Sequence, residues 1–564
     1  MKYIFVSGGV LSGLGKGITA ASIGTLLQSY GLKVTLMKCD MYLNIDAGTM
    51  NPMEHGEVFV THDGLETDQD LGHYERFTGQ TLTRENYLTN GQIYRYVLDK
   101  ERALDYDGVC VEPYHVIPPE IIKKWKEAGA AHNADIVIVE FGGTVGEYEG
   151  LLFFEAYRKL KLEHPDDVCL VHVGYLPAPS SIGELKSKPI QQSIIALNSL
   201  GVLPDFVIGR AARDIDMKRK EKIAYASGLP IENIISNPDV DSVYFVPLTL
   251  DEEKIAPKIL KRLKIKHRKK DLTEWKALVR KVNNAVKPVK IGIVGKYQKT
   301  GDYILSDSYV SVVEALNHAG FYLGAKAQVS WIDSQSLEGI DERKIESLLS
   351  EFDGIIVPQG WGSRGIEGKI KAIEYARENK VPYLGLCFGM QMATIEFARH
   401  VLNFETANTT EANPKTSCPV IHVMDNQKEY LLKKNYGGTI RLGAWPCKVM
   451  AGTKLYDAYK KYGMGKASPW WIPNPRLHQQ STASHQMVIH ERHRHRYEFN
   501  NKFKKDFEKN GFVISGTSPD GHLVEAIELK DHPFFVGTQF HPEYISRPLT
   551  PHPVFISFLE ACLE

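Results

Sequence analysis

The sequence FVSGGVLSGLGKGITAAS, residues 5–22, joins an apolar run to a glycine-rich turn and then to residues with helical spacing. This order predicts a buried β-strand, a phosphate-binding loop and an amphipathic helix. A standard phosphate loop has a glycine, four residues, then Gly-Lys and a Ser or Thr that holds magnesium. Here five residues separate Gly9 from Gly15, and Gly17 follows Lys16. We therefore expect this loop to hold phosphate while other residues hold the metal.

Further short apolar runs recur between amphipathic stretches in both halves of the chain. Buried strands of a parallel sheet have this pattern. In the first half the runs are KVTLMKCD, ADIVIVEFGG, DVCLVHVGYL and PDFVIGR, and in the second half they are VKIGIVGKY, QVSWIDS, GIIVPQG and VPYLGLC. The sequence therefore predicts an α/β protein with two domains, of which the first is built on a P-loop-type parallel sheet.

A cationic, helix-forming segment separates the two sets of strands. Residues 261–290, KRLKIKHRKKDLTEWKALVRKVNNAVKPVK, contain no strand pattern, and the second set of strands begins near Pro288. The predicted borders are an N-terminal domain at 1–264, a helical linker at 265–288 and a C-terminal α/β domain at 289–564.

A second irregular region lies inside the C-terminal half. From Val449 to Gln486 the strand and helix patterns give way to aromatic, Pro and small residues. We expect an inserted surface loop, in which the Trp470 and Trp471 pair packs locally.

The composition is that of an ordinary globular enzyme. Hydrophobic residues make up 43% of the chain and charged residues 24%, and 68 Lys and Arg balance 68 Asp and Glu. This balance indicates neither a nucleic-acid nor a membrane partner. The seven cysteines include no CxxC pair, which favours reduced thiols over disulfides or a zinc site. No window approaches the ~18 apolar residues of a membrane span, so we expect a cytoplasmic protein.

The strongest catalytic pattern is VPYLGLCFGMQMA, residues 381–393. Gly385, Cys387 and Gly389 form a G-x-C-x-G turn between an apolar strand and a helix. Such an elbow exposes its central residue at a helix N-terminus. There the pKa of a thiol is lowered and backbone N–H groups can stabilise an oxyanion.

A nucleophilic cysteine needs a base, and the base needs a group that orients it. FFVGTQFHPEYISRP, residues 534–548, places His541 and Glu543 directly after another apolar strand. A lone cysteine is more often a buried structural residue. The combination of elbow and strand-end His-x-Glu favours a catalytic site with Cys387 as nucleophile.

With these motifs, residues 289–564 resemble the class I glutamine amidotransferase domain. The resemblance implies that Cys387 attacks the glutamine amide, that His541 is the base with Glu543 as its partner, and that ammonia is released. It also implies that the N–H groups of Gly360 and Phe388 face the oxyanion. The implied glutamine-binding residues are Gly360, Phe388, Gly389, Met390, Gln391, Glu411 and Arg496.

The resemblance is imperfect at VPQGWGSRG, residues 357–365. The family usually has Pro-Gly-Gly-Phe-Gly, whereas this chain has Gln359 for the first glycine and Trp361 for the aromatic residue. If the first position needs a positive φ, glutamine would strain the loop or leave the oxyanion hole poorly formed until activation.

Four longer blocks in the first half resemble the CTP synthase family in order and spacing. They are KCDMYLNIDAGTMNPMEHGEVFVTHDGLETDQDLGHYERFTG, EFGGTVGEYEG, ELKSKPIQQS and NPDVDSVYFVPL. With the glutaminase motifs, the resemblance covers nearly the whole chain. It implies that ATP phosphorylates O4 of the uracil in UTP and that ammonia displaces this phosphate at C4, which gives CTP. Phosphorylation is needed because the uracil oxygen is otherwise a poor leaving group.

The resemblance also assigns residues to the N-terminal site, with Lys16 acting on the transferred phosphoryl group. The implied ATP-binding residues are Gly13, Leu14, Gly15, Lys16, Gly17, Ile18, Lys38, Asp70, Asp239 and Val240. The implied UTP- and CTP-binding residues are Ser12, Glu147, Tyr148, Glu149, Lys186, Ser187, Lys188, Pro189, Ile190, Gln191 and Lys222. Asp70 and Glu140 are the candidate ligands for Mg²⁺.

The family is tetrameric, activated by GTP and inhibited by CTP, and filaments are a further expectation. Residues 108–120, GVCVEPYHVIPPE, depart from the family at its interface and feedback region, and Pro238 replaces an expected lysine. Two alternatives stay open: an amidoligase acting on another substrate, and a paralogue that assembles with little catalysis. KSKPIQ, residues 186–191, argues against the first, whereas Gln359 and Pro238 leave the second open.

Overall fold

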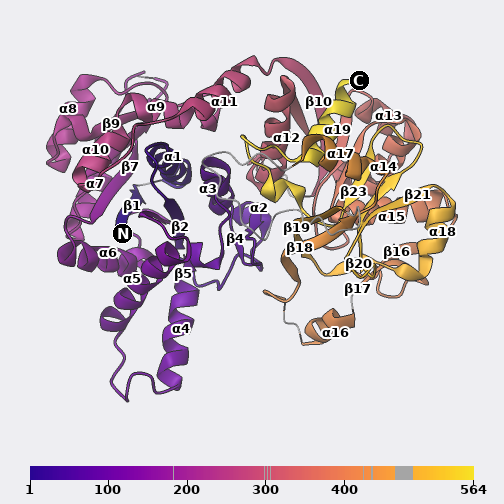
Figure 1. Ribbon diagram of the computed structural model, residues 1–564, viewed down its shortest axis with the longest axis horizontal. Helices are drawn as coiled ribbons and strands as arrows, with labels where there is room; N and C mark the ends of the chain where they lie inside the picture. The colour runs from indigo at the N-terminus through magenta and orange to yellow at the C-terminus, as the bar shows by residue number, and fades with distance from the viewer. Residues whose placement is uncertain are drawn as a thin grey trace. The chain divides into compact units, whose positions relative to one another are not determined.

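A computed structural model describes residues 1–564 except residues 10, 182, 297–298, 301–302, 305, 424, 434–435 and 464–486. The described residues form two compact units (Figure 1). Unit 1 consists of Met1–Asp46 and Asp70–Val279, and unit 2 consists of Ala47–Gln69 and Arg280–Glu564. The N-terminal half of the chain therefore contributes one segment, Ala47–Gln69, to unit 2.

Unit 1 is a parallel sheet covered by helices on both faces. Its described strands have the order β5-β2-β6-β1-β7-β8-β9, and every neighbouring pair is parallel. The strands are β1 (Lys2–Gly8), β2 (Val34–Asp40), β5 (Tyr87–Thr89), β6 (Ile136–Phe141), β7 (Val168–Tyr175), β8 (Phe206–Ala211) and β9 (Ile234–Pro238). The sheet order reverses around β1, and in such folds ligands bind beyond the carboxyl ends of the strands at that point.

The helices of unit 1 pack in two groups. α1 packs with α3, α9 and α10 on one face, whereas α4, α5 and α6 pack together on the other (Figure 1). The helices are α1 (Lys16–Ser29), α3 (Asp70–Thr78), α4 (Asn90–Arg102), α5 (Pro113–Ala131), α6 (Leu151–Glu163), α7 (Lys188–Ser199), α8 (Met217–Ser227), α9 (Val246–Glu252) and α10 (Ile255–Arg262). α11 (Thr273–Asn284) crosses from unit 1 into unit 2 and lies within the predicted helical linker.

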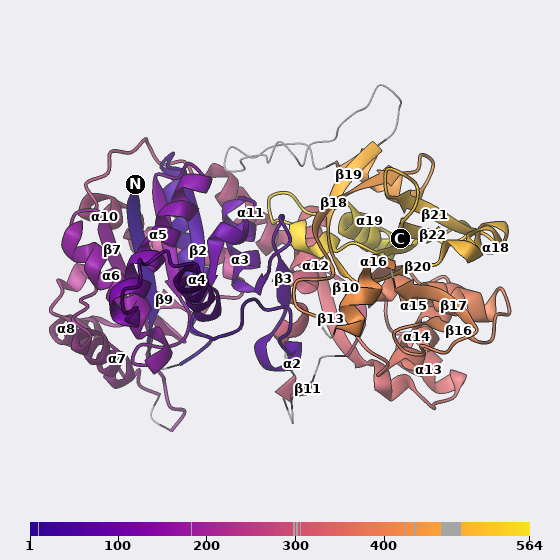
Figure 2. The same ribbon diagram turned by 90° about the horizontal axis from the view of Figure 1, so that it is seen from below.

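Unit 2 is built on a mixed sheet. Its described order is β13-β10-β14-β15-β23-β22-β21-β18-β19, parallel from β13 to β23 and antiparallel beyond. The strands are β10 (Lys287–Gly295), β13 (Ala325–Asp333), β14 (Gly354–Val357), β15 (Tyr383–Leu386), β18 (Arg441–Val449), β19 (Met487–His495), β21 (Phe512–Thr517), β22 (Val524–Leu529) and β23 (Phe535–Thr538). Figure 2 shows β18 and β19 side by side at one edge of this sheet.

Helices cover both faces of the unit 2 sheet, with α12, α17 and α19 packed together on one face and α13, α14 and α15 on the other. They are α12 (Val310–Leu323), α13 (Glu342–Leu349), α14 (Ile366–Glu378), α15 (Phe388–His400), α17 (Lys454–Tyr462) and α19 (Pro553–Leu563), with the smaller α2 (Pro52–His55), α16 (Asp425–Leu432) and α18 (Lys504–Lys509). The remaining short strands are β3 (Val58–Val60), β4 (Glu66–Asp68), β11 (Lys299–Thr300), β12 (Tyr303–Ile304), β16 (Ala407–Thr409), β17 (Cys418–Val423) and β20 (Tyr497–Phe499).

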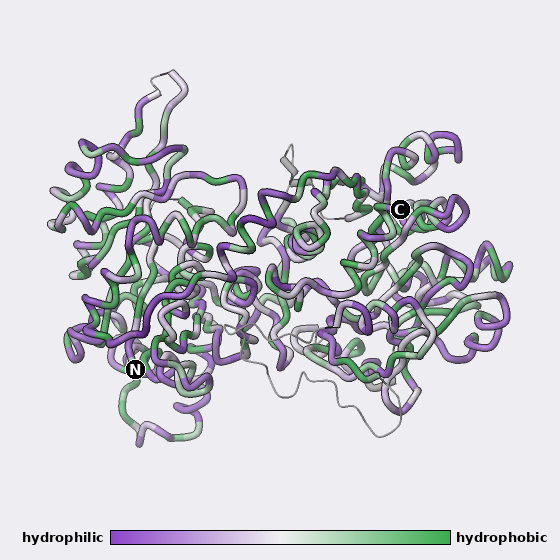
Figure 3. The backbone as a smooth tube through the Cα atoms, turned by 45° about the horizontal axis from the view of Figure 1, so that its top comes forward, coloured by the Kyte–Doolittle hydropathy of each residue, from purple (hydrophilic) through white to green (hydrophobic). Residues whose placement is uncertain are grey.

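The α/β fold class and all of the predicted apolar strands are confirmed. Most of their residues are buried because helices cover both faces of each sheet, whereas those of β13 at the sheet edge are half-buried or exposed apart from Ala325. Figure 3 shows long hydrophobic stretches of the backbone in the interior and hydrophilic colour on many peripheral loops. Among the described helices, none combines the length and apolar character that crossing a bilayer requires.

Two details differ from the sequence-based expectations. The predicted first domain, 1–264, includes segment 47–69, whose strand β3 instead packs in unit 2, where the rings of Phe59 and Tyr544 lie 5.2 Å apart. The irregular loop predicted from Val449 is wrong in its first part, because α17 (Lys454–Tyr462) follows β18 there. The Trp470 and Trp471 pair lies outside the described residues.

Candidate active site

The predicted phosphate loop lies between β1 and α1 of unit 1. Gly13 and Gly15 have φ of 71° and 78°, a left-handed conformation that only glycine adopts without strain. Gly15 is the N-cap of α1, and among the described residues no side-chain hydrogen bond caps the first N–H groups of this helix. Exposed N–H groups and the helix dipole make such an N-terminus a site for an anion.

Two buried lysines lie beside this loop. Lys16 is 8% exposed, its Nζ donates to the carbonyl of Gly143 at 2.7 Å, and burial lowers its pKa. Lys38 lies on β2, where its Nζ donates to Glu140 Oε1 at 3.2 Å and to Asp70 Oδ2. The two lysines lie beside the N-terminus of α1, so this region suits a polyanion such as a triphosphate.

Two carboxylates complete the cluster. Asp70 is the first residue of α3, and Glu140 lies on β6 opposite Lys38 in the strand register. Burial, with the charge of Asp70 adding to it, raises the pKa of Glu140 to about 7. Burial also opposes ionisation of Asp70, but Lys38, His73 and Lys16 outweigh it and lower the pKa of Asp70 to about 2. Asp70 therefore carries a negative charge at neutral pH.

The missing hydroxyl of the phosphate loop has a physical explanation. A Cβ atom added at Gly17 would lie 2.3 Å from Asp70 Oδ1 and 3.4 Å from Glu140 Oε2. The two carboxylates thus occupy the space into which a Ser or Thr side chain at this position would point. Since carboxylate oxygens are the ligands that Mg²⁺ prefers, the residues present fit a magnesium ion.

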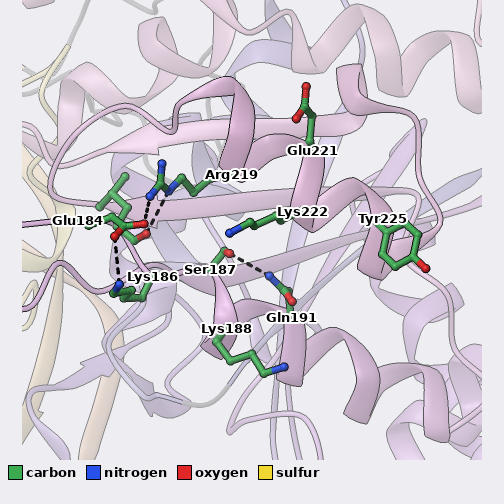
Figure 4. Close-up of a pocket in the computed structure, with 10 residues that line it drawn as sticks. Glu184, Lys186, Ser187, Lys188, Gln191, Arg219, Glu221, Lys222 and Tyr225 are labelled. Carbon is green, nitrogen blue, oxygen red and sulfur yellow. Dashed lines mark hydrogen bonds and ion pairs between the residues drawn. The ribbon is translucent and has the colours of Figure 1, made fainter.

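A second feature of unit 1 is an open cavity of about 560 Å³. Figure 4 shows Lys186, Lys188 and Lys222 around it, with Glu184 held by Lys186 and Arg219. The lining residues are Glu184, Leu185, Lys186, Ser187, Lys188, Gln191, Arg219, Glu221, Lys222 and Tyr225. The structure therefore brings the 186–191 segment together with Lys222, and it adds Arg219 and Tyr225, which the sequence motifs did not indicate.

Other predicted nucleotide residues lie elsewhere in unit 1. Asp239 follows β9 and accepts from Arg210 Nη2 at 2.7 Å. Arg210 Nε in turn lies 3.9 Å from the Cβ position of Gly15, so Asp239 and Val240 lie near the phosphate loop. Ser12 and 147–149 are exposed and do not line the lysine-rich cavity. Pro189 and Ile190 belong to the first turn of α7, and Leu14 and Ile18 flank the start of α1.

In unit 2, Cys387 stands on the predicted elbow between β15 and α15. Its φ of 51° and ψ of −95° are strained for a residue other than glycine, as expected for an exposed nucleophile position. The two flanking positions have no room for a side chain, so both must be glycine. A Cβ at Gly389 would lie 2.0 Å from the carbonyl oxygen of Val357, and one at Gly385 would lie 2.8 Å from the backbone of Gly389.

The predicted base and its partner are in contact. His541 Nδ1 and Glu543 Oε1 are 2.7 Å apart, and both side chains are buried. Burial opposes protonation of His541, but Glu543 and Cys387 outweigh it and raise the pKa of His541 to about 10. His541 Nε2 is buried and has no hydrogen-bond partner among the described residues. The structure thus brings Cys387, His541 and Glu543 together.

The backbone of the proposed oxyanion loop is relaxed at the unusual glutamine. Gln359 is not among the described non-glycine residues with positive φ, so the strain considered for it is absent. Gly360 and Phe388 both line the cavity at Cys387. Lys296 Nζ holds the next turn through the carbonyls of Trp361 at 3.0 Å and Gly362 at 2.7 Å.

The predicted glutamine-binding side chains converge on this cavity, which measures about 10 Å³. Gln391 donates to the carbonyl of Tyr497 at 3.0 Å, and Glu411 accepts from the Gly362 N–H at 2.6 Å. Arg496 donates to Gln427 at 2.6 Å. The cavity is lined by Gln359, Gly360, Trp361, Cys387, Phe388, Gln391, Glu411, Arg494, His495, Arg496, Tyr497 and His541. Gly389 and Met390 lie behind it, in the first turn of α15.

Sequence reasoning missed Gln539, Arg494 and Tyr497 at this site. Gln539 donates to Cys387 Sγ at 3.5 Å, and its place two residues before His541 was the available signal. Trp361, Glu411, Arg494, Arg496 and Tyr497 also line a second cavity of about 270 Å³ that segment 47–69 helps to enclose. No local pattern in the sequence could assign that segment to this site.

The fold and site of unit 2 are those of a class I glutamine amidotransferase, here joined to an α/β unit with a phosphate loop. A family model described as "Glutamine amidotransferase class-I" matches residues 304–561, and one described as "CTP synthase N-terminus" matches residues 2–265. The chain is 48% identical to a CTP synthase of Caldanaerobacter subterraneus subsp. tengcongensis over 564 residues, which cover 100% of this chain and 98% of that relative. The chain belongs to the CTP synthase family.

Two further likenesses accompany this match. A CTP synthase of Bacillus thuringiensis (strain Al Hakam) is 47% identical over 563 residues, which cover 100% of this chain and 98% of that relative. Among solved structures, the Trypanosoma brucei CTPS glutaminase domain with bound acivicin has 33% sequence identity and a TM-score of 0.41, and the match covers 49% of this chain and 94% of that chain.

Proposed function

We propose that this chain converts UTP, ATP, glutamine and water into CTP, ADP, phosphate and glutamate. One observation carries the proposal: a single chain that matches CTP synthases over its whole length holds both a phosphate loop with a buried Lys–carboxylate cluster and a cysteine elbow beside a His–Glu pair. The first can activate an oxygen by phosphorylation, and the second can release the ammonia that replaces it.

The proposed glutaminase step takes place at Cys387. Its sulfur attacks the amide carbon of glutamine, and the N–H groups of Gly360 and Phe388 stabilise the negative oxygen that forms. His541 transfers the thiol proton to the leaving ammonia, and Glu543 holds the imidazole through Nδ1. Water then hydrolyses the thioester to glutamate. Gln391, Glu411 and Arg496 are the proposed side chains that hold the substrate.

The proposed synthetase step takes place at the phosphate loop. O4 of the uracil attacks the γ-phosphorus of ATP, and ADP leaves. Ammonia then adds at C4 and loses a proton to solvent, and the C4–O bond breaks with release of phosphate. The proposed role of Lys16 and Lys38 is to neutralise charge on the phosphates during the first transfer. We place the acceptor nucleotide in the 560 Å³ cavity, where Lys186, Lys188 and Lys222 match the charge of a triphosphate.

Asp70 and Glu140 are the residues we propose to hold Mg²⁺. The fit rests on two carboxylates, the half-buried Asp70 and the buried Glu140, that lie next to Gly17 at the start of α1. A bound Mg²⁺ would neutralise negative charge on the phosphates of ATP. Glu140, whose pKa is raised to about 7, must release its proton to serve as a ligand.

The family suggests properties beyond the reaction. We propose activation by GTP, inhibition by CTP, assembly into a homotetramer that can form filaments, and a cytoplasmic location. We further propose that residues 1–264 carry the synthetase function, 265–288 the linker and 289–564 most of the glutaminase. Mass measurements with and without UTP and ATP would test the tetramer, since a monomer under both conditions contradicts it.

The reaction itself is tested with purified full-length protein, UTP, ATP and Mg²⁺, with ammonium or glutamine as nitrogen donor. We expect CTP from both donors and none when Mg²⁺ is removed with a chelator. An amidoligase for another substrate would hydrolyse glutamine but form no CTP from either donor. A paralogue with little catalysis would assemble without either activity.

A single methyl group at Gly17 is expected to damage the synthetase selectively. In Gly17→Ala the Cβ would lie 2.3 Å from Asp70 Oδ1, so the carboxylate must move. Misplacement of a catalytic group by about 1 Å costs on the order of 100-fold in rate. We expect ammonia-dependent CTP formation to fall by that order, while glutamine hydrolysis without nucleotides changes little. Ammonia-dependent activity within threefold of the parent would contradict the assigned position of the carboxylates.

A further inference from the structure

A hairpin from the N-terminal half of the sequence lies against the glutaminase site within unit 2. We call residues 57–68 the buttress hairpin; it comprises Glu57, β3 and β4, and its strands pair from Val58–Asp68 to Val60–Glu66. Its backbone accepts two hydrogen bonds from side chains of unit 2. Tyr544 OH donates to the carbonyl of Val58 at 3.0 Å, and Arg492 Nη1 donates to the carbonyl of Val60 at 2.9 Å.

The same two residues position His541. The ring of Tyr544 stacks on the imidazole with centroids 4.8 Å apart and planes inclined by 13°. The carbonyl of Arg492 accepts from the backbone N–H of His541 at 2.8 Å. Tyr544 and Arg492 therefore each connect the hairpin to His541, and each does so as a single intervening residue.

Glu57 connects the hairpin to the oxyanion loop. It is 3% exposed and accepts from the Ser311 N–H at 3.1 Å, from the Ser311 hydroxyl, and from Gln359 Nε2 at 3.5 Å. Gln359 directly precedes Gly360, whose N–H we propose as an oxyanion donor. Glutamine at this position thus supplies an amide that a glycine could not, and this amide reaches the hairpin.

Glu66 connects the hairpin to the nucleophile. Its Oε1 accepts from Arg494 Nε at 2.8 Å, and both side chains are buried. The backbone carbonyl of Arg494 lies 3.7 Å from Cys387 Sγ and accepts from it. Loss of the Glu66 charge would leave a buried guanidinium with a weaker partner and would let this backbone shift.

We propose that the buttress hairpin is a positioning element of the glutaminase site, with Glu57 and Glu66 as its positioning residues. Through Gln359, Arg494 and the two residues that hold His541, it contacts the oxyanion loop and the neighbours of the base and nucleophile. The inference rests on the proposed function of Cys387 in glutamine hydrolysis. It adds that the glutaminase is incomplete without residues 57–68.

The first test replaces each carboxylate by its amide in the full-length chain. In Glu57→Gln and Glu66→Gln we expect kcat for glutamate release to fall about tenfold with KM within about twofold, because oxyanion contacts act only in the transition state. Ammonia-dependent CTP formation should stay within twofold. Glu54→Gln, an exposed position on the same segment, is the matched control and should change neither activity.

The second test asks whether Glu57 acts through Gln359. Glu57→Ala and Gln359→Ala are measured singly and together for glutamate release. If the two residues form one contact, the double variant should be no slower than the slower single variant. If the loss of rate in the double variant equals the product of the two single losses, Glu57 does not act through Gln359. An unchanged rate of glutamate release in both amide variants would overturn the positioning role.

Failure of the inference can be separated from failure of the proposed function. A parent protein that forms no CTP from ammonia or glutamine overturns the proposed function, and glutamate release alone then decides the role of the hairpin. Equal loss of ammonia-dependent and glutamine-dependent synthesis in Glu57→Gln would overturn the inference, because the hairpin would then act on unit 1 or on folding.

Discussion

Replacement of Cys387 by alanine is expected to abolish CTP formation from glutamine while leaving CTP formation from ammonia within about twofold of the parent. The thiol is the only described sulfur at the elbow, where φ of 51° directs it toward the cavity shared with His541. Without a nucleophile no thioester forms, and removal of a central catalytic residue costs on the order of 10⁶-fold in kcat. Alanine can adopt the same backbone conformation as the cysteine that it replaces.

The measurement is CTP formation with either nitrogen donor in the same protein preparation. Ammonia-dependent activity reports that the chain is folded and that unit 1 works, so the glutamine result can be attributed to the thiol. Cys447→Ala is a suitable control, because this cysteine is also buried in unit 2 but lies on β18, away from the cavity lining. Loss of both activities in Cys387→Ala would mean that the two steps are not divided between the units.

Replacement of Lys16 by methionine is expected to give the opposite pattern. Methionine keeps the unbranched shape of a side chain that is 8% exposed, but it removes the charge beside Glu140, Asp70 and Lys38. Charge neutralisation is the main catalytic requirement of phosphoryl transfer. We expect CTP formation from both donors to fall by about 10³-fold or more, whereas basal glutamate release should remain.

Substrate binding and catalysis can be separated in this variant. If Lys16 acts mainly on the transferred phosphoryl group, kcat should fall far more than the affinity for ATP. Lys33→Met, a lysine just before β2 and outside the cluster, serves as the control. CTP formation within tenfold of the parent in Lys16→Met would exclude a central role for this lysine and would direct attention to Lys38.

Local patterns predicted much of the fold and much of both sites. The strand, glycine-rich turn and helix around Lys16 follow from apolar periodicity and glycine placement, as does the elbow at Cys387. The pairing of His541 with Glu543 was predictable because residues at positions i and i+2 after a strand lie close together. The need for a carboxylate near the loop followed from the missing hydroxyl at Gly17.

The relations across long sequence separations were not predictable from the pattern. The three residues of β3 (Val58–Val60) lie in a block that was recognised only by its resemblance to a family, and their sequence does not show against which residues they pack. Glu57 and Gln359 are 302 positions apart, and neither residue type is unusual in a loop or beside a strand. Likewise, the sequence suggested that carboxylates outside the loop hold the metal. Only the structure shows that Asp70 occupies the space of the absent side chain at Gly17.

The membership of segment 47–69 in unit 2 limits how this chain can be recombined with its relatives. A chimera joined once, within α11, would pair one parent's β3 and β4 with the other parent's Gln359, Arg494 and Tyr544. A functional exchange of glutaminases therefore requires three junctions instead of one, so that this short stretch travels with its partners. Residues on the two sides of these contacts are therefore expected to covary among relatives of this chain.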